Sequence, residues 1–427
     1  MYNNLFLQKP EPIWQLALNQ NICANYLKCI NAHQFLSPFN NHVMNKISKQ
    51  LVVVLMVALF ACSCQKQALK PTEPTTESAL TLRKNLLSEN AVTAALSSNV
   101  SVFATGFQNP RGLEFGPDGN LYVAEGGTGG TTLSTCAYQV PFPVGPYLGS
   151  PIGGRISKVS PAGVRTTLAN NFPSSSANEI IGGDVEGVAD VTFMDNTMYA
   201  LIAGGGCSHG VPTFPNGVVK VAANGSWTWV ANISTWLMSH PVKNPEADDF
   251  EPDGTPYSII NVRGDLYAIE PNHGDLMKIT TDGNISRVID VSASQGHIVP
   301  TALAYHGNFY LGNLHPFPIV PDAKIFKINP AGEIKVWATG LSTVVGLAFD
   351  DADRMYVLEN TVGAPFPTPG LGRILRINPS GATTIIATGL SLPTGMTMGP
   401  DGNLYVSNWG FSPVSTAGGG EVLKVTL

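Results

Sequence analysis

The sequence carries little charge. Asp, Glu, Lys and Arg make up 13% of its 427 residues, about half the share found in ordinary soluble domains. It has no cluster of Lys and Arg with interleaved aromatic residues, and its net charge of −6 is mild. These two absences argue against a nucleic-acid partner. The main apolar run, residues 51–61, is far shorter than the roughly 20 residues that a membrane-spanning helix needs.

Glycine and proline, by contrast, are abundant. The chain holds 44 Gly and 32 Pro, the residues that tight turns between short strands require. Together with the low charge, this composition favours an all-β protein. The length would fit two or three average domains, but all-β propellers and barrels often form one large unit.

The N-terminal region indicates export. Residues 44–61 comprise a start at Met44, two lysines and eleven apolar residues, the pattern of a secretory signal peptide. Leu59-Phe60-Ala61-Cys62 resembles the lipobox of bacterial lipoproteins, which predicts lipidation at Cys62, with Cys64 as the alternative, and a place in the cell envelope. Residues 1–43 then form a mis-assigned upstream extension, and the polar, proline-containing stretch 62–97 forms a tether.

The rest of the chain, residues 98–427, is built from repeats. The stretches 109–125 and 392–408 each contain a strand, a Gly-Pro-Asp-Gly turn and a second strand, and four weaker copies lie between them. Each hairpin is followed by a third strand that alternates apolar and basic residues and by a fourth strand such as 385–390. Four strands per unit and six units predict a six-bladed β-propeller with four-stranded antiparallel blades.

One copy of the fourth strand stands alone. The last repeat ends at Leu427 without a fourth strand, whereas Val102–Phe107 precedes the first hairpin. This N-terminal strand is therefore expected to close the ring and to remove an exposed sheet edge. The first two repeats carry about 25–30 extra residues each beyond a typical blade, mainly in 126–153 and 234–255, which we expect to be loops on one face of the disc.

Several motifs resemble those of the ScyD/ScyE family of exported propellers with NHL-type repeats and a TolB-like fold. They are Ala-Glu-Gly-Gly-Thr-Gly-Gly at 124–130, Gly-Cys-Ser-His-Gly at 206–210, Glu-Pro-Asn-His-Gly at 270–274 and Gln-Gly-His-Ile-Val-Pro-Thr at 295–301. The resemblance implies the propeller fold and export. It implies no particular reaction.

Polar residues end the second strand in five of the six hairpins. They are Glu125, Glu270, Asn313, Glu359 and Asn408. In a propeller these positions surround the mouth of the axial channel, where Glu125, Glu270 and Glu359 would be able to bind a hard cation such as Ca²⁺. The alternative is that all five bind the backbone of the adjoining loops.

Three histidines form a second candidate group. His209, His273 and His297 lie in loops on the same predicted face, and with Glu251 or Glu270 they would be able to bind a transition metal or act in acid–base catalysis. The string at 206–210 also fits the G-x-S-x-G pattern of serine hydrolases, but the strand–turn–helix context that this pattern needs is not predicted.

The two cysteines of the propeller, Cys136 and Cys207, follow the second strands of adjacent blades. Either a disulfide between them, which an exported protein allows, or two free thiols is possible. Gluconolactonase-type propellers, which the shape also resembles, bind a metal at the starts of the innermost strands. The matching positions here include Arg111 and Glu186, of which only Glu186 has the expected chemistry.

Three functions are consistent with these patterns. The first is a lipid-anchored envelope protein that binds a small molecule or an exported protein through its loop-bearing face, without turnover. The second is a metal-dependent hydrolase or lactonase that uses Glu125, Glu270 and Glu359 with one or more of the histidines. A purely structural surface protein is the third possibility.

Overall fold

The computed structural model describes residues 95–427 except 134–135, 137–139, 141–143, 178–183, 246–249 and 411–417. The upstream extension 1–43, the signal peptide 44–61, Cys62 and nearly all of the tether 62–97 therefore lie outside the described residues. In the part that is described, no helix is long and apolar enough to cross a membrane.

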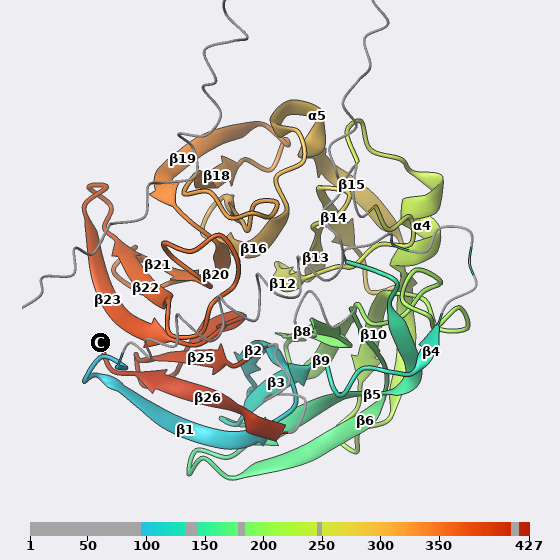
Figure 1. The fold of residues 1–427 in the computed structure, drawn as a ribbon, viewed down its shortest axis with the longest axis horizontal. Helices are drawn as coiled ribbons and strands as arrows, with labels where there is room; N and C mark the ends of the chain where they lie inside the picture. The colour runs from blue at the N-terminus through green and yellow to red at the C-terminus, as the bar shows by residue number, and fades with distance from the viewer. Residues whose placement is uncertain are drawn as a thin grey trace, which may run out of the picture. The chain divides into compact units, whose positions relative to one another are not determined.

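The strands form six antiparallel sheets, which are the blades of a propeller (Figure 1). Each sheet contains four main strands, and its innermost strand contacts the innermost strand of the next blade around a common axis. The last blade contacts the first in the same way, through β24 (Gly395–Met398) and β2 (Pro110–Phe115). The prediction of a six-bladed, all-β propeller is confirmed.

The first three blades follow one plan, from the innermost strand outward. Blade 1 consists of β2, β3 (Leu121–Glu125), β5 (Leu148–Val159) and β6 (Arg165–Ser176). Blade 2 consists of β8 (Val188–Met194), β9 (Thr197–Ile202), β10 (Gly217–Val221) and β11 (Trp227–Asn232). Blade 3 consists of β12 (Ser258–Val262), β13 (Asp265–Glu270), β14 (Asp275–Ile279) and β15 (Ile285–Asp290).

The other three blades repeat the plan with one exception. Blade 4 consists of β16 (Pro300–Tyr305), β17 (Phe309–Asn313), β18 (Ala323–Ile328) and β19 (Ile334–Leu341). Blade 5 consists of β20 (Val344–Phe349), β21 (Met355–Glu359), β22 (Gly372–Ile377) and β23 (Thr383–Leu390). Blade 6 takes β24, β25 (Leu404–Asn408) and β26 (Gly420–Val425) from the end of the chain, and its outermost strand is β1 (Val100–Phe107).

β1 closes the ring as the sequence predicts. It pairs antiparallel with β26, in a register that places Val100 opposite Val425 and Phe107 opposite Gly420. Just before β1, the Ser97 amide donates to the Thr388 backbone oxygen of blade 5 at 3.2 Å. The outer edge of blade 6 is thus covered by a strand from the other end of the described chain.

The hairpin turns explain why the repeats fold locally. In blade 1 the amide of Gly119, at a φ of 74°, donates to the Gly116 oxygen at 3.0 Å, and glycine adopts this left-handed conformation at no steric cost. Asp118 accepts hydrogen bonds from the Tyr122 hydroxyl at 2.9 Å and from Lys158 at 2.7 Å. The turn is therefore tied to both the second and the third strand of its blade.

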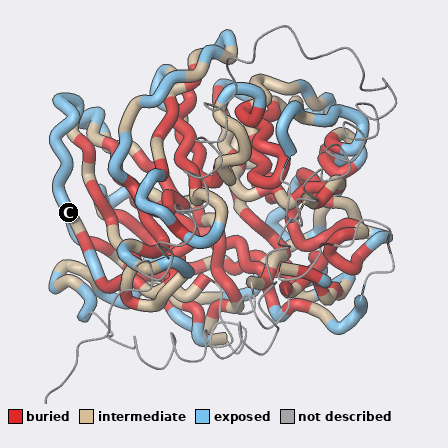
Figure 2. The backbone as a smooth tube through the Cα atoms, turned by 45° about the horizontal axis from the view of Figure 1, so that its top comes forward, coloured by how far each residue is buried: buried red, intermediate tan, exposed pale blue. Residues whose placement is uncertain are grey.

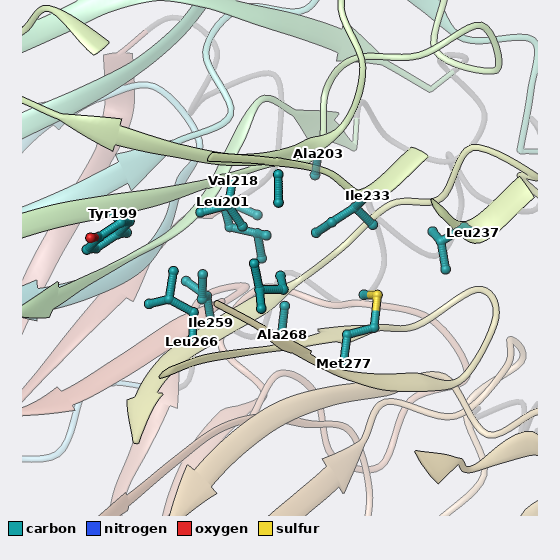
Figure 3. Packing of buried hydrophobic residues seen from close by; sticks show 13 residues of the cluster. Tyr199, Leu201, Ala203, Val218, Ile233, Leu237, Ile259, Leu266, Ala268 and Met277 are labelled. Atoms are coloured by element: carbon teal, nitrogen blue, oxygen red, sulfur yellow. The ribbon is translucent and has the colours of Figure 1, made fainter. Parts of the chain in front are cut away.

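Apolar side chains fill the spaces between neighbouring blades. Between blades 2 and 3, Leu201 and Val218 of one blade pack with Ile259, Leu266 and Met277 of the other (Figure 3). Burial runs along the inner strands, whereas the exposed segments lie mainly at turns and outer strands (Figure 2). Complete burial of one such side chain contributes about 1.5–3 kcal/mol, so the inter-blade contacts are the main source of cohesion.

The long insertions contain more regular structure than expected. In blade 1, β5 and β6 continue past the blade as a hairpin, with β4 (Thr132–Leu133) added to β5 and β7 (Val185–Glu186) added to β6. In blade 2, the short helix α4 (Ile233–Ser239) begins where Asn232 accepts a hydrogen bond from the Thr235 amide. The expectation of loops throughout 126–153 and 234–255 is therefore wrong in these parts. A second short helix, α5 (Ser292–Gln295), precedes blade 4.

Candidate functional site on the loop-bearing face

The loops that join the second to the third strands, and one blade to the next, emerge on one face of the propeller, here called the loop-bearing face. Arg111 of β2 lies near the axis on this side and is only 8% exposed. Its guanidinium donates to the Asp184 carboxylate at 2.7 Å and to the Val185 backbone oxygen at 2.6 Å. Burial alone would lower the pKa of Arg111, but Asp184, Tyr257 and Glu186 together raise it above its ordinary value. Arg111 thus stays cationic and fixed against the segment that leads to β7.

Glu186 of β7 and His209 form the centre of the site. His209 is fully buried, and its Nε2 donates to Glu186 Oε2 at 2.7 Å and lies 3.3 Å from Glu251 Oε2. Burial alone would lower the pKa of His209, but the negative charges of Glu251 and Glu186 raise it to about 10. Burial would likewise raise the pKa of Glu186, yet the charge of His209 lowers it. At neutral pH the structure therefore holds an imidazolium between two carboxylates.

His209 lies in the loop between β9 and β10, and the other edge of its ring contacts the neighbouring residue of that loop. Its Nδ1 lies 3.2 Å from Ser208 Oγ, and that hydroxyl donates to Asp253 Oδ1. Asp253 Oδ2 also accepts from the amides of Cys207 at 2.5 Å and Ser208 at 3.2 Å. Ser208 is completely buried in a turn, so the string at 206–210 has neither the exposed hydroxyl nor the helix of a nucleophile elbow.

The extended hairpin of blade 1 covers this loop. The ring of Tyr147 packs on His209 with centroids 4.6 Å apart. Cys136 is joined to Cys207 by a disulfide with a Cα–Cα distance of 5.8 Å, which is an ordinary span for such a bond. Blades 1 and 2 are thus linked covalently at the edge of the site.

A second charged pair continues the site into blade 3. Glu270 Oε2 accepts from His273 Nδ1 at 2.9 Å and from the His273 amide at 2.5 Å. Burial would raise the pKa of Glu270 and lower that of His273, but their mutual attraction reverses both shifts. Thr255 connects the two pairs, since its hydroxyl donates to Glu186 at 2.7 Å and its amide to Glu270 at 2.8 Å.

These side chains make up one connected set, here called the acidic network. It contains five carboxylates and three cationic groups: Asp184, Glu186, Glu251, Asp253 and Glu270, with Arg111, His209 and His273. When all are ionised, five negative and three positive charges leave an excess of two negative charges. The side chains of Asp184, Glu186 and Arg111 remain 33%, 13% and 10% exposed. This outer part of the network faces solvent, and the buried histidine pairs support it from behind.

The cavity beside the network is small. A cavity of about 20 Å³, lined by Arg111, Glu186, Thr255 and Tyr257, lies next to it, and such a volume holds about one water molecule. The innermost strands approach so closely here that a Cβ on Gly112 would collide with Asp190. An organic ligand is therefore expected to bind at the outer face of the network rather than inside the channel.

The five predicted strand-end residues have a common structural role. Four of them accept a hydrogen bond from the amide of the residue that enters their own blade: Gln108 to Glu125 at 2.6 Å, Thr255 to Glu270 at 2.8 Å, Ser342 to Glu359 at 2.6 Å and Ser391 to Asn408 at 2.8 Å. Asn313 donates to the Ile298 oxygen at 3.0 Å and accepts from the Lys324 amide at 2.8 Å. Each side chain thereby fastens an inter-blade loop.

Two of these acids are also paired with an arginine of the neighbouring strand. Arg155 donates to Glu125 at 2.7 Å, and Arg373 donates to Glu359. Among the described residues, no group of three or more His, Cys, Asp or Glu side chains is arranged to hold a metal ion. The calcium site at Glu125, Glu270 and Glu359 stays a prediction.

The predicted site residues thus separate into two groups. Arg111, Glu186, His209, Glu270 and His273 belong to the acidic network, whereas Glu125, Asn313, Glu359 and Asn408 fasten loops in other blades. His297 lies half-buried between α5 and β16. The sequence did not single out Asp184, Asp253 or Thr255. For Asp253 the available signal was its place in the Glu-Pro-Asp-Gly turn at 251–254.

Comparisons with known proteins give distant structural similarities. No protein-family profile and no curated protein matches the chain. A Thermus thermophilus putative glucose dehydrogenase is 18% identical with a TM-score of 0.47, over 78% of this chain and all of that one. A Xanthomonas campestris gluconolactonase is 9% identical with a TM-score of 0.46, over 77% of this chain and 89% of that one. A Bacteroides thetaiotaomicron protein of unknown function is 11% identical with a TM-score of 0.49, over 77% of this chain and 76% of that one.

Proposed function

We propose that this chain is an exported, lipid-anchored propeller of the ScyD/ScyE type that binds a small molecule or an exported protein through its loop-bearing face, without turning it over. The observation that carries the proposal is the acidic network. Its carboxylates and cations are paired with one another across three blades, so they form a preorganised surface. Preorganisation favours binding because few side chains have to be ordered when the ligand arrives.

The charge of the network restricts the ligand. With all of its groups ionised the network carries two excess negative charges, and the solvent-exposed part of it consists of Asp184, Glu186 and Arg111. Electrostatic complementarity therefore favours a cationic or donor-rich ligand, such as an amine, an amino sugar or a basic segment of a protein.

The expected site in the cell follows from the N-terminal segment. A signal peptide at 44–61 and lipidation of Cys62 would place the propeller at the cell envelope, held by the tether 62–97. Replacing Cys62 with alanine should release the protein from the membrane fraction, whereas Cys64→Ala should not. If Cys64→Ala alone releases the protein, the lipidated residue is Cys64 rather than Cys62.

Binding can be tested on the soluble chain that begins at residue 65. Its melting temperature is measured with spermidine, choline or glucosamine as cationic probes and with citrate or glucuronate as anionic probes. We expect at least one cationic probe to raise the melting temperature in a saturable way, and Glu186→Gln to abolish that rise. Asp351→Asn removes an exposed charge remote from the network and should leave the rise unchanged.

Two results would contradict the proposal. One is the absence of any saturable effect of the cationic probes, and the other is an equal effect in Glu186→Gln. Elemental analysis of the same preparation tests the alternative, because a stoichiometric metal that is lost in Glu270→Gln would favour a metal-dependent hydrolase.

A further inference from the structure

A second cavity lies in blades 4 and 5, away from the three blades that carry the acidic network. It measures about 650 Å³ and lies between their outer strands, β19 and β23, which Figure 1 shows at the periphery of the ring. Binding sites for small organic molecules usually have volumes of about 300–1,000 Å³. The cavity is thus large enough for such a molecule, whereas the cavity of about 20 Å³ beside the acidic network is not.

Its lining combines an apolar floor with a polar rim. Leu375 and Ile377 of β22 form the floor, and the half-buried ring of Trp337 forms one wall. The rim carries hydroxyl groups, those of Thr339, Ser380 and Thr383. This mixture of an aromatic surface, aliphatic groups and a few hydrogen-bonding groups is typical of small-molecule sites.

The cavity carries no net charge. The one ionisable side chain in its lining is Arg373, which is 24% exposed and donates through Nε to the fully buried Glu359. The Glu359 carboxylate balances the guanidinium charge, while the exposed part of the guanidinium can still donate hydrogen bonds. An uncharged ligand with acceptor oxygens matches this lining better than a carboxylate or an amine does.

A comparison between blades explains why the space exists. In β23, Thr383 and Ile385 stand opposite Ile377 and Leu375 of β22. In blade 2 the same two register positions, opposite Val221 and Val219, hold Trp227 and Trp229.

In blade 2 these indole rings contact other aromatic rings, although Trp229 stays 41% exposed. Trp227 lies 5.6 Å from Phe172 of blade 1, and Phe214 lies 5.6 Å from Trp227 and 5.1 Å from Trp229 between ring centroids. Aromatic side chains thus occupy the cleft between blades 1 and 2, whereas Thr383 and Ile385 are too small to do so between blades 4 and 5. Blade 2 shows that the fold accommodates large aromatic side chains at these two positions, so tryptophan there is a suitable way to fill the cavity in blade 5.

We propose that the cavity between blades 4 and 5 binds an uncharged, ring-containing small molecule with hydrogen-bond-accepting oxygen atoms. Its ring packs on Trp337 and the apolar floor, and its oxygens accept hydrogen bonds from Arg373 and from the hydroxyl groups of the rim. This second site is independent of the acidic network and does not require the function proposed for that network.

Nile red, an uncharged four-ring dye with a carbonyl oxygen, is a suitable probe because its fluorescence rises in apolar surroundings. We expect one molecule to bind per propeller, with a micromolar dissociation constant. Ile385→Trp and, separately, Thr383→Trp imitate blade 2 and should each weaken binding by at least about tenfold. The melting temperature of each variant shows whether it is folded.

The matched control is Val102→Trp. Val102 is 51% exposed and stands opposite Leu423 in blade 6, at the register position that Ile385 occupies in blade 5. This variant and Glu186→Gln should bind Nile red as the parent protein does. Undiminished binding by folded Ile385→Trp and Thr383→Trp, or an equal loss in Val102→Trp, would overturn the proposal.

Discussion

The hydroxyl of Tyr257 donates a hydrogen bond of 2.9 Å to the backbone oxygen of Thr394. Tyr257 precedes β12 of blade 3, and Thr394 precedes β24 of blade 6, which are opposite blades in a ring of six. Burial raises the pKa of Tyr257, so the hydroxyl keeps its proton. The bond therefore crosses the propeller axis and ties together two halves of the ring that are 137 residues apart in sequence.

Tyr257→Phe should reduce the free energy of unfolding by about 1–3 kcal/mol. The ring still fills its place, but the buried Thr394 oxygen loses its donor. Urea unfolding measures the change, and Tyr310→Phe is the control because the hydroxyl of Tyr310 has no hydrogen-bond partner in the described part of the chain. Equal losses in both variants would mean that the cross-axis bond contributes no stability of its own.

The stability of the protein should depend on the protonation of His209. Its pKa is raised from 6.5 to about 10, so the folded state holds this proton more tightly than the unfolded state. The resulting stabilisation is fully present below pH 6.5 and is lost as the pH rises through about 10. The difference in melting temperature between the parent protein and His209→Gln should therefore be largest near pH 6 and shrink towards pH 10.

The control is Gln295→Ala, which changes a side chain without a titratable group outside the acidic network. Its difference in melting temperature from the parent protein should stay constant between pH 6 and pH 10. A constant difference between the parent and His209→Gln over that range would show that His209 acts by packing alone, for instance through its contact with Tyr147.

The disulfide should stabilise the loop-bearing face. Cys136 and Cys207 enclose a long loop, with a sequence separation of 71, and closing a loop of this size removes about 4 kcal/mol of conformational entropy from the unfolded chain. The variant Cys136→Ser/Cys207→Ser should melt at a lower temperature, as should the parent protein in reductant. Reductant should have no further effect on the variant, and a parent protein insensitive to reductant would contradict the expectation.

Ring closure by β1 can be tested by moving the strand. A chain that begins at Gln108 lacks the outer strand of blade 6, and we expect it to aggregate or to unfold at a much lower temperature. Because Val100 lies opposite Val425, joining residues 98–107 after Leu427 through a short turn should restore the melting temperature. A truncated chain as stable as the parent would show that β1 is dispensable.

The sequence predicts the blades well because their structure is local. In blades 2 to 5 the hairpin and the third and fourth strands lie within about 50 residues, and their turn glycines are visible in the sequence. The closing strand was also predictable, since Val102–Phe107 is a fourth strand without a repeat of its own. The helix α4 was missed because it is short and only two of its apolar side chains, Ile233 and Leu237, are buried.

The site was harder to predict because many of its contacts join residues of different blades near the propeller axis. The sequence identified the positions of Glu125, Glu270 and Glu359. It did not reveal their partners, which are amides of the loops that lead into the same blades. Asp184 and Thr255 join the acidic network only because blades 1, 2 and 3 converge at the axis. No spacing in the sequence encodes that convergence.

The pairing of β1 with β26 also sets an order of events in time. Val100 and Val425 are separated by nearly the whole described chain, so blade 6 cannot be completed until β26 has been synthesised. Contacts of such long sequence separation form slowly, and until then the edge of β26 is open to other chains. The interval between the end of synthesis and the docking of β1 is therefore the period in which this protein is most prone to aggregate.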